Sequence, residues 1–183
     1  MSLAKTTIAA AVFALASSVA IAQDNPMVGG AAMLAEKNIV ENAVNSADHT
    51  TLVAAVKAAG LVETLQSPGP FTVLAPTNDA FGKLPDGTVD TLLMEENKDQ
   101  LVKVLTAHVV SGKLSASDLV SRARANGGRY NMKTVSGDAL TAEVRGSNVY
   151  IYDEAGGAAL VTIADVNQSN GVIHVVDDVL LPR

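Results

Sequence analysis

The strongest constraint on the fold is the segment of residues 69–85, which reads GPFTVLAPTNDAFGKLP. Its first half, Phe71–Leu74, is rich in the β-branched and aromatic residues that favour strands. Pro76 cannot donate a hydrogen bond to a neighbouring strand, so we expect the strand to end there. Thr77 is a predicted helix N-cap, because its hydroxyl can accept a hydrogen bond from an amide in the next turn. The segment therefore predicts a strand, a sharp corner and the start of a short helix.

The side chains around the predicted cap have mainly structural explanations. Asp79 falls in the first helical turn, where the positive end of the helix dipole favours a carboxylate. Phe81 and Pro76 occupy the two positions of a hydrophobic staple. Asn78 is less constrained by capping, and its side chain is a candidate for contact with a partner. We expect Thr77, Asn78, Asp79 and Phe81 to be structural, with an interaction role as the alternative.

The first residues have the pattern of a secretory signal peptide. Lys5 is followed by an uncharged apolar stretch, and Ala20–Ala22 has the small-x-small pattern that signal peptidase accepts. We predict a signal peptide at residues 1–22, cleaved before Gln23, and hence a secreted or periplasmic protein. The alternative is a retained membrane anchor, which the Ala-rich composition and the short length of the stretch disfavour.

The rest of the chain is predicted to be a flexible N-terminal leader followed by one domain. Residues 23–37 contain an Asn-Pro and a Gly-Gly pair, which are typical of irregular chain. Helical periodicity dominates from residue 38, and strand patterns follow the pair Gly127-Gly128. Helices first and strands later, without an internal repeat, predict an α+β domain over residues 38–183.

Composition excludes several classes of function. The chain has no cysteine, which rules out disulfides, thiolate metal sites and cysteine nucleophiles. It carries 13 basic and 19 acidic residues, with a formal charge of −6, and no basic cluster is apparent, so we expect no binding to nucleic acid. The sequence has no metal-ligand spacing, phosphate loop or serine-hydrolase elbow. We therefore predict no metal, no cofactor, no catalytic residue and no enzyme activity.

The three histidines are the remaining candidates for chemistry. His108 falls on an apolar helical face and His174 lies among the valines and isoleucine of a predicted strand, so both are predicted to be core residues bonded to the backbone. His49 follows Asp48, the predicted N-cap of a helix, and is expected to be exposed. The alternative is a hydrolase or small-ligand protein that uses His108 or His174 with a nearby carboxylate.

Three stretches of the chain resemble the signature segments of fasciclin-like (FAS1-type) domains. FTVLAPTNDAF at Phe71–Phe81 resembles the first signature, and NGVIHVVDDVLLP at Asn170–Pro182 resembles the second. LTAHVVSGKL at Leu105–Leu114 resembles the histidine-bearing segment between them. Two long signatures in the right order are a specific signal. The resemblance covers Asn38–Pro182, which is most of the chain.

This resemblance implies a fasciclin-like wedge-shaped β-sandwich flanked by helices, with the two signature strands as neighbours in the core. It also implies a non-enzymatic cell-adhesion or matrix-interaction module of the single-domain secreted bacterial type. The family usually has a Tyr-His pair in the central segment, associated in animal members with receptor binding, whereas this chain has Ala107-His108.

The expected partner is a cell-surface or extracellular protein or glycan. Self-association is a further expectation, and no membrane segment is expected after signal cleavage. A carbohydrate-binding module is an alternative, although three tyrosines, three phenylalanines and no tryptophan give it few stacking platforms.

Overall fold

The computed structural model describes residues 25–183, so the predicted signal peptide lies outside the described residues. The α-helices are α1 (Ile39–Ala43), α2 (Thr50–Ala59), α3 (Val62–Gln66), α4 (Asn78–Gly82), α5 (Thr88–Leu93), α6 (Lys98–Ala107) and α7 (Ala116–Ala125), with short 3-10 helices η1 (Ala47–His49) and η2 (Glu95–Asn97). The strands are β1 (Met27–Val28), β2 (Ala31–Ala32), β3 (Phe71–Pro76), β4 (Val109–Ser111), β5 (Arg129–Lys133), β6 (Ala139–Arg145), β7 (Asn148–Tyr152), β8 (Ala158–Gln168) and β9 (Gly171–Val176).

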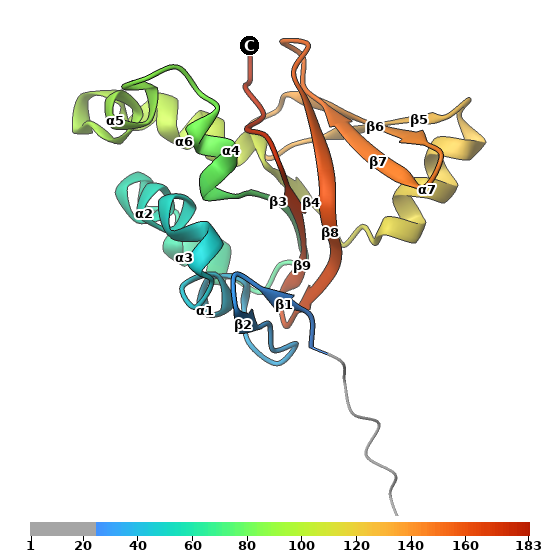
Figure 1. Cartoon of the computed structure of the whole chain (residues 1–183), viewed down its shortest axis with the longest axis horizontal. Helices are drawn as coiled ribbons and strands as arrows, with labels where there is room; N and C mark the ends of the chain where they lie inside the picture. The colour runs from blue at the N-terminus through green and yellow to red at the C-terminus, as the bar shows by residue number, and fades with distance from the viewer. Residues whose placement is uncertain (1–24) are drawn as a thin grey trace, which may run out of the picture.

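Seven strands form one strongly bent sheet in the order β4-β3-β9-β8-β7-β6-β5. Strands β3 and β9 pair in parallel, with Phe71 opposite Gly171, and the other pairs are antiparallel. A single bridge between Val110 and Thr134 joins the two edges, so the sheet nearly closes on itself. The helices α1 to α6 cover one side, and α7 lies at the other end of the wedge (Figure 1). The α+β prediction and the pairing of the two signature strands are confirmed.

Strands β3 and β9 are buried on both faces because they separate two hydrophobic cores. Successive side chains of a strand point to opposite faces. Val73 and Val175 face the helices and pack in the helical core. Leu74 and Val176 face the inside of the sheet, where α7 contributes Leu119. Every residue of β9 is buried, which explains why its sequence, apart from His174, is apolar without alternation.

The N-terminal hairpin of β1 and β2 differs from the predicted flexible leader. Val28 and Met33 are only 4% and 2% exposed, and both belong to the helical core. The backbone N–H of Met33 also donates to the Pro26 carbonyl at 3.0 Å. These residues pack against the domain, so residues 27–33 differ from the expected loose connector.

Local sequence signals account for several helix ends. Gly60 adopts a left-handed conformation at the end of α2, and Ser115 forms a capping box with Asp118 at the start of α7. The predicted N-cap Asp48 is wrong, because η1 occupies that position and α2 begins after it at Thr50.

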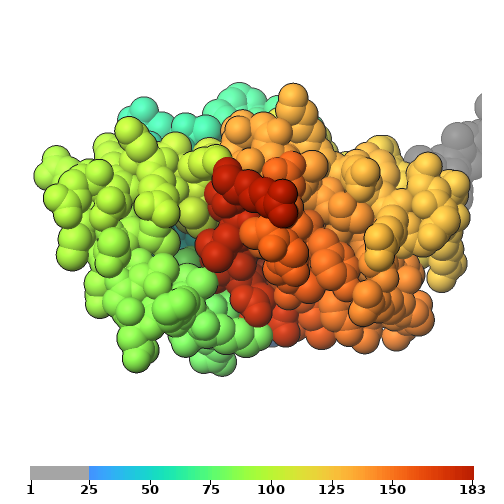
Figure 2. All heavy atoms as spheres, turned by 90° about the horizontal axis from the view of Figure 1, so that it is seen from above, coloured from blue at the N-terminus to red at the C-terminus, as the bar shows by residue number. Residues whose placement is uncertain are grey.

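The C-terminal residues lie across the junction between the helical side and the sheet (Figure 2). Leu180, in this segment, is 1% exposed and packs with Leu74 and Val176 in the hydrophobic core inside the bent sheet. Among residues 25–183 no helix has the length and apolar character needed to cross a membrane.

Candidate interaction site

The corner after β3 is built as the sequence predicts. The Thr77 hydroxyl accepts a hydrogen bond from the Ala80 N–H at 3.2 Å and so caps α4. Phe81 is 7% exposed and packs in the helical core, while Asp79 is exposed in the first turn. Of these side chains, Asp79 is the one that faces solvent.

Asn78 has a structural role that the sequence did not indicate. Its side-chain oxygen accepts hydrogen bonds from the Thr51 N–H at 3.0 Å and from the Thr50 hydroxyl at 3.1 Å. Its side-chain nitrogen donates to the Ala47 carbonyl at 2.8 Å. The amide therefore holds the start of α2 against α4, which leaves it little freedom to contact a partner.

His108 is locked in the core by the backbone. Its Nδ1 lies 2.8 Å from the Val104 carbonyl, and its Nε2 accepts from the Leu180 N–H at 2.9 Å. A nitrogen that accepts from an N–H cannot carry a proton, so the ring is the neutral Nδ1–H tautomer. Burial lowers the pKa of His108, which is consistent with the neutral form.

His174 has the opposite tautomer for the same reason. Its Nε2 lies 2.8 Å from the Leu114 carbonyl, and its Nδ1 accepts from the Asp165 N–H at 3.3 Å. The side chain is 0% exposed, and burial lowers its pKa. Because the backbone occupies both ring nitrogens of His108 and of His174, neither ring is available as a general base. The hydrolase alternative thus loses the base it requires.

His49 is buried, so the expectation that it is exposed is wrong. Its side chain is 3% exposed, and its Nδ1 lies 2.9 Å from the Ser46 hydroxyl. The reason is η1, which turns the chain so that the ring points inward rather than following an N-cap to the surface. The other ring nitrogen, Nε2, makes no hydrogen bond.

Asn170 is a central polar residue that sequence reasoning missed. Its side-chain oxygen accepts from the Ile39 N–H at 3.1 Å, and its nitrogen donates to the carbonyls of Leu65 at 2.7 Å and Ser67 at 3.0 Å. It is 6% exposed. Asn170 thus ties α1 and the end of α3 to the start of β9. An Asn-Gly pair such as Asn170-Gly171 is typical of a turn and does not by itself indicate these hydrogen bonds.

The outer face of β5, β6 and β7 brings together aromatic and charged side chains that the sequence analysis did not select. Val149 and Ile151 are buried, so the alternating residues Tyr150 and Tyr152 point to the outer face. Register places Glu143 opposite Tyr150 and also opposite Arg129. With Arg145, these residues form what we call the tyrosine–arginine face: Arg129, Glu143, Arg145, Tyr150 and Tyr152.

The tyrosine–arginine face is ordered by its own contacts. The Arg145 guanidinium lies 5.5 Å from the centre of the Tyr150 ring and 5.6 Å from that of Tyr152. Glu143 accepts from Nε of Arg145 at 2.7 Å and from Nε of Arg129 at 3.0 Å. The Arg129 and Arg145 side chains remain 67% and 56% exposed. The face therefore presents two positioned cations to solvent.

The electrostatics of this face favour an anionic partner. The hydrogen bond from Arg145 is the main cause that lowers the pKa of Glu143, and the charge of Arg129 adds to it. Glu143 is thus ionised at neutral pH and neutralises one of its two arginines. The face carries net positive charge on a chain of formal charge −6.

Comparison with known proteins identifies the family. The fasciclin domain matches residues 47–182. The chain belongs to the fasciclin domain family. Protein sll1483 of Synechocystis is 48% identical over 160 residues, which cover 87% of this chain and 82% of that protein. The immunogenic protein MPB70 of Mycobacterium bovis is 34% identical over 145 residues, covering 76% of this chain and 66% of that protein.

A solved structure of the family shares the fold. The FAS1 domain pair of the insect cell adhesion molecule fasciclin I matches with a TM-score of 0.71 and 18% identity, covering 79% of this chain and 51% of that chain. That neighbour is a cell adhesion molecule, and members of the fasciclin domain family are non-enzymatic. Ala107, where the family usually has tyrosine, is 1% exposed at the end of α6 and offers no side chain to a partner.

Proposed function

We propose that this chain is an exported adhesion-type module that binds an acidic protein at a cell surface or in the matrix through the tyrosine–arginine face. The observation that carries the proposal is the position of Arg145 over Tyr150 and Tyr152 on an exposed sheet face. Tyrosine and arginine are the residue types that most often dominate the binding energy of protein interfaces.

The geometry favours a protein over a glycan as the partner. Sugars bind to aromatic side chains mainly by lying flat against an open ring face. Arg145 already lies over the rings of Tyr150 and Tyr152, so open stacking platforms are reduced. The Nε of Arg145 bonds to Glu143, and its terminal N–H groups can bind a carboxylate of an acidic partner.

Export is the second part of the proposal. The apolar stretch and the small residues Ala20–Ala22 support a signal peptide cleaved before Gln23. The domain that follows has no cysteine, so its stability outside the cytoplasm depends on packing and hydrogen bonds. N-terminal sequencing of the protein from extracytoplasmic fractions tests this point: a start at Gln23 supports export, and an intact Met1 in the cytoplasm contradicts it.

Binding is tested with tagged mature protein and intact cells or envelope from the source organism. We expect saturable binding that weakens as ionic strength rises, because the contact is charged. Protease treatment of the envelope should remove the binding, and periodate oxidation of glycans should not. Retention no greater than that of an inert control of equal charge would contradict the adhesion role. Loss of binding after periodate alone would assign the partner to glycans.

A further inference from the structure

Strand β5 forms one end of the seven-stranded sheet, and one edge of its backbone is open. The strand pairs along its length with β6 alone. The strand at the other end of the sheet, β4, meets this segment at the bridge between Val110 and Thr134, just past the end of β5. The edge before that bridge lies at the α7 end of the wedge (Figure 1). An end strand of this kind carries backbone groups with which a further strand can pair.

The hydrogen bonds at the two ends of β5 show which of its backbone groups face β6. In an antiparallel pair, successive residues direct their N–H and C=O groups alternately toward the partner strand and away from it. The Thr134 N–H donates to the Asp138 carbonyl at 2.9 Å. The Gly128 carbonyl accepts from the Val144 N–H at 3.1 Å. The even-numbered positions of this segment therefore bond to β6.

The odd-numbered positions direct their backbone groups away from β6. Just beyond β5, the Val135 N–H donates to the Val109 carbonyl of β4 at 2.8 Å, as this alternation requires. Arg129 and Asn131 have the same phase, so their N–H and C=O groups point to the open edge. Both residues are exposed. The edge therefore offers donors and acceptors to an added strand.

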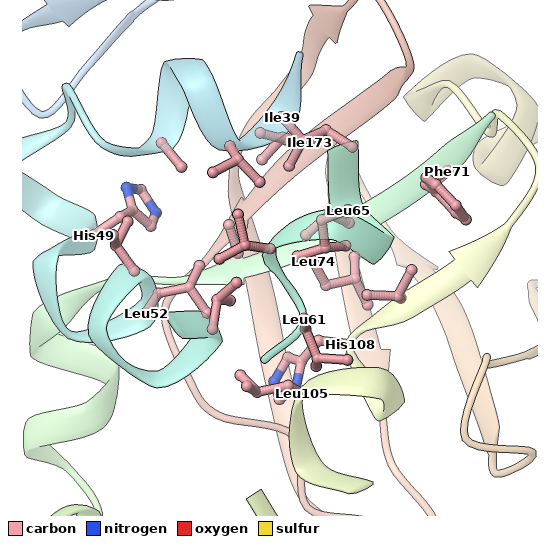
Figure 3. Close-up of a pocket in the computed structure, with 18 of the residues that line it drawn as sticks. Ile39, His49, Leu52, Leu61, Leu65, Phe71, Leu74, Leu105, His108 and Ile173 are labelled. Atoms are coloured by element: carbon pink, nitrogen blue, oxygen red, sulfur yellow. The ribbon is translucent and has the colours of Figure 1, made fainter. Parts of the chain in front are cut away.

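The opposite end strand of the sheet, β4, is buried. Val109 and Val110 are 6% and 4% exposed. Val109 also lines the apolar pocket between the helices and β3, next in the chain to His108, whose ring reaches the same pocket (Figure 3). A further strand therefore finds exposed backbone at β5 and not at β4.

The side chains of β5 place a row of polar groups on the outer face of the sheet. Tyr130 and Met132 face the hydrophobic core inside the bent sheet. The alternating residues Arg129, Asn131 and Lys133 are exposed and share the outer face with the rest of the tyrosine–arginine face. A strand added to this edge therefore brings every second side chain beside these three residues.

The charges of this row select an acidic strand. Arg129 shares Glu143 with Arg145, and Lys133 makes no salt bridge within residues 25–183. A second copy of β5, paired antiparallel about Asn131, would place Arg129 opposite Lys133. Like charges directly opposite one another destabilise a strand pair, whereas opposite charges stabilise it. The edge thus disfavours pairing with itself and favours a segment that carries carboxylates.

We propose that the acidic partner contributes an extended segment that pairs antiparallel with β5, with carboxylates at alternate positions beside Arg129 and Lys133. This inference rests on the proposed function, because Arg129 belongs to both the edge and the tyrosine–arginine face. Residues directly opposite one another in an antiparallel pair have their side chains on the same face. The acidic residues of the partner are therefore the ones whose backbone groups bond to Arg129 and Asn131, and the residues between them point their backbone groups to solvent.

The first test is a short capped peptide of alternating glutamate and valine, titrated into the mature protein and followed by the amide NMR signals of β5. One modified peptide carries N-methyl groups on its glutamates and another on its valines. We expect saturable binding of the unmodified and valine-methylated peptides, and at least about tenfold weaker binding of the glutamate-methylated one, which lacks the donors to β5. A peptide with lysine in place of glutamate should not bind. Equal binding of the two methylated peptides, or no saturable shift with the unmodified one, overturns the proposal.

Amide hydrogen exchange locates the added strand. The N–H groups of Arg129 and Asn131 should exchange at least about tenfold more slowly when the unmodified peptide is bound, because they gain hydrogen bonds. The N–H groups of Tyr130 and Met132 already face β6 and should change less. Unchanged exchange at Asn131 in the saturated complex contradicts pairing at this edge.

A variant pair separates this inference from the proposed function. Asn131→Pro removes the N–H that faces the open edge, and Asn131→Ala loses the same bond to the Thr141 hydroxyl but keeps that N–H. We expect Asn131→Pro to bind envelope protein at least about tenfold more weakly than Asn131→Ala. Equal binding by the two folded variants, with loss of binding on removal of Tyr150 and Tyr152, would overturn the strand pairing and leave the proposed function intact. If Asn131→Pro does not fold, the methylated peptides decide the question.

Discussion

Gly171 lies opposite Phe71 in the parallel pairing of β3 and β9, and a side chain at Gly171 would overlap the Phe71 carbonyl. The two residues begin the two strands that carry the family signatures. The backbones approach so closely here that only glycine fits. The close contact explains why β9 begins with a glycine, which here serves the strand pairing as well as the turn.

Replacing Gly171 with alanine should destabilise the domain by about 1–3 kcal/mol, because the new Cβ must push β3 and β9 apart. The matched control is Gly82→Ala, since a Cβ at Gly82 would meet no atom within 4 Å. We expect Gly82→Ala to change the free energy of unfolding by no more than about 1 kcal/mol, in the stabilising direction. Urea denaturation measures both. Equal stability of Gly171→Ala and wild type would contradict this view of the strand pairing.

Asn170→Ala should cost about 2–4 kcal/mol in the free energy of unfolding. The change leaves the Ile39 N–H and the carbonyls of Leu65 and Ser67 without their bonds to this side chain. Asn167→Ala is the control, because Asn167 is exposed and bonds only to a carbonyl two residues away. Hydrogen exchange should show that Asn170→Ala loosens α1 and α3 before the sheet. Uniform loss of protection across the domain would contradict this local role.

The variant Asn78→Ala distinguishes a structural role of the corner after β3 from a role in partner binding. We expect a loss of about 1–2 kcal/mol of stability, because two hydrogen bonds to the start of α2 and one to η1 disappear. Binding to cells or envelope should not change while the protein stays folded. The exposed Asp79→Asn is the control and should alter stability by no more than about 0.5 kcal/mol. A loss of binding in a stable Asn78→Ala protein would show that this corner takes part in partner binding.

Stability should fall as the pH drops below about 6.5. Burial lowers the pKa of His49, His108 and His174 in the folded protein below the ordinary value of 6.5. The unfolded chain therefore takes up protons first, so the stability is complete above pH 6.5 and declines below it until the folded-state pKa values are reached. Each histidine contributes at most about 1.4 kcal/mol per pH unit.

Urea denaturation at pH 7.5, 6.5 and 5.5 checks this decline. This range lies above the pKa of ordinary carboxyl groups, so histidines dominate the change. His108→Gln lowers stability overall but should make the decline shallower, because one titrating group is removed. A free energy of unfolding that is constant or rises from pH 7.5 to 5.5 would show that the histidines are not buried in neutral form.

The sequence predicted those parts of the fold that local chemistry decides. Pro76 and Thr77 specify the corner without help from distant residues, and Gly60 does the same for the end of α2. Strand β5 was not predicted, because Arg129–Lys133 is mainly polar and forms a strand only through pairing with β6. The buried position of His49 also depends on packing between segments.

The tyrosine–arginine face escaped prediction because it depends on strand register. Tyr150 and Tyr152 are two positions apart, which is the spacing that places strand residues on one side. What the sequence did not show is that the hairpin with β6 brings Arg145 over both rings and that β5 adds Arg129. Of the candidates chosen from the sequence, Asn78, His108 and His174 make hydrogen bonds within the domain, whereas the proposed face lies in a segment without a motif.

The most direct test of the central claim compares binding by two variants of the mature protein. Tyr150→Ser/Tyr152→Ser/Arg145→Gln removes the tyrosine–arginine face, and Lys98→Gln removes a cation from the helical side. Circular dichroism and urea denaturation confirm that each is folded. We predict that the first variant binds envelope protein at least about tenfold more weakly than wild type, and that Lys98→Gln binds like wild type. Wild-type affinity in the folded first variant would contradict the claim.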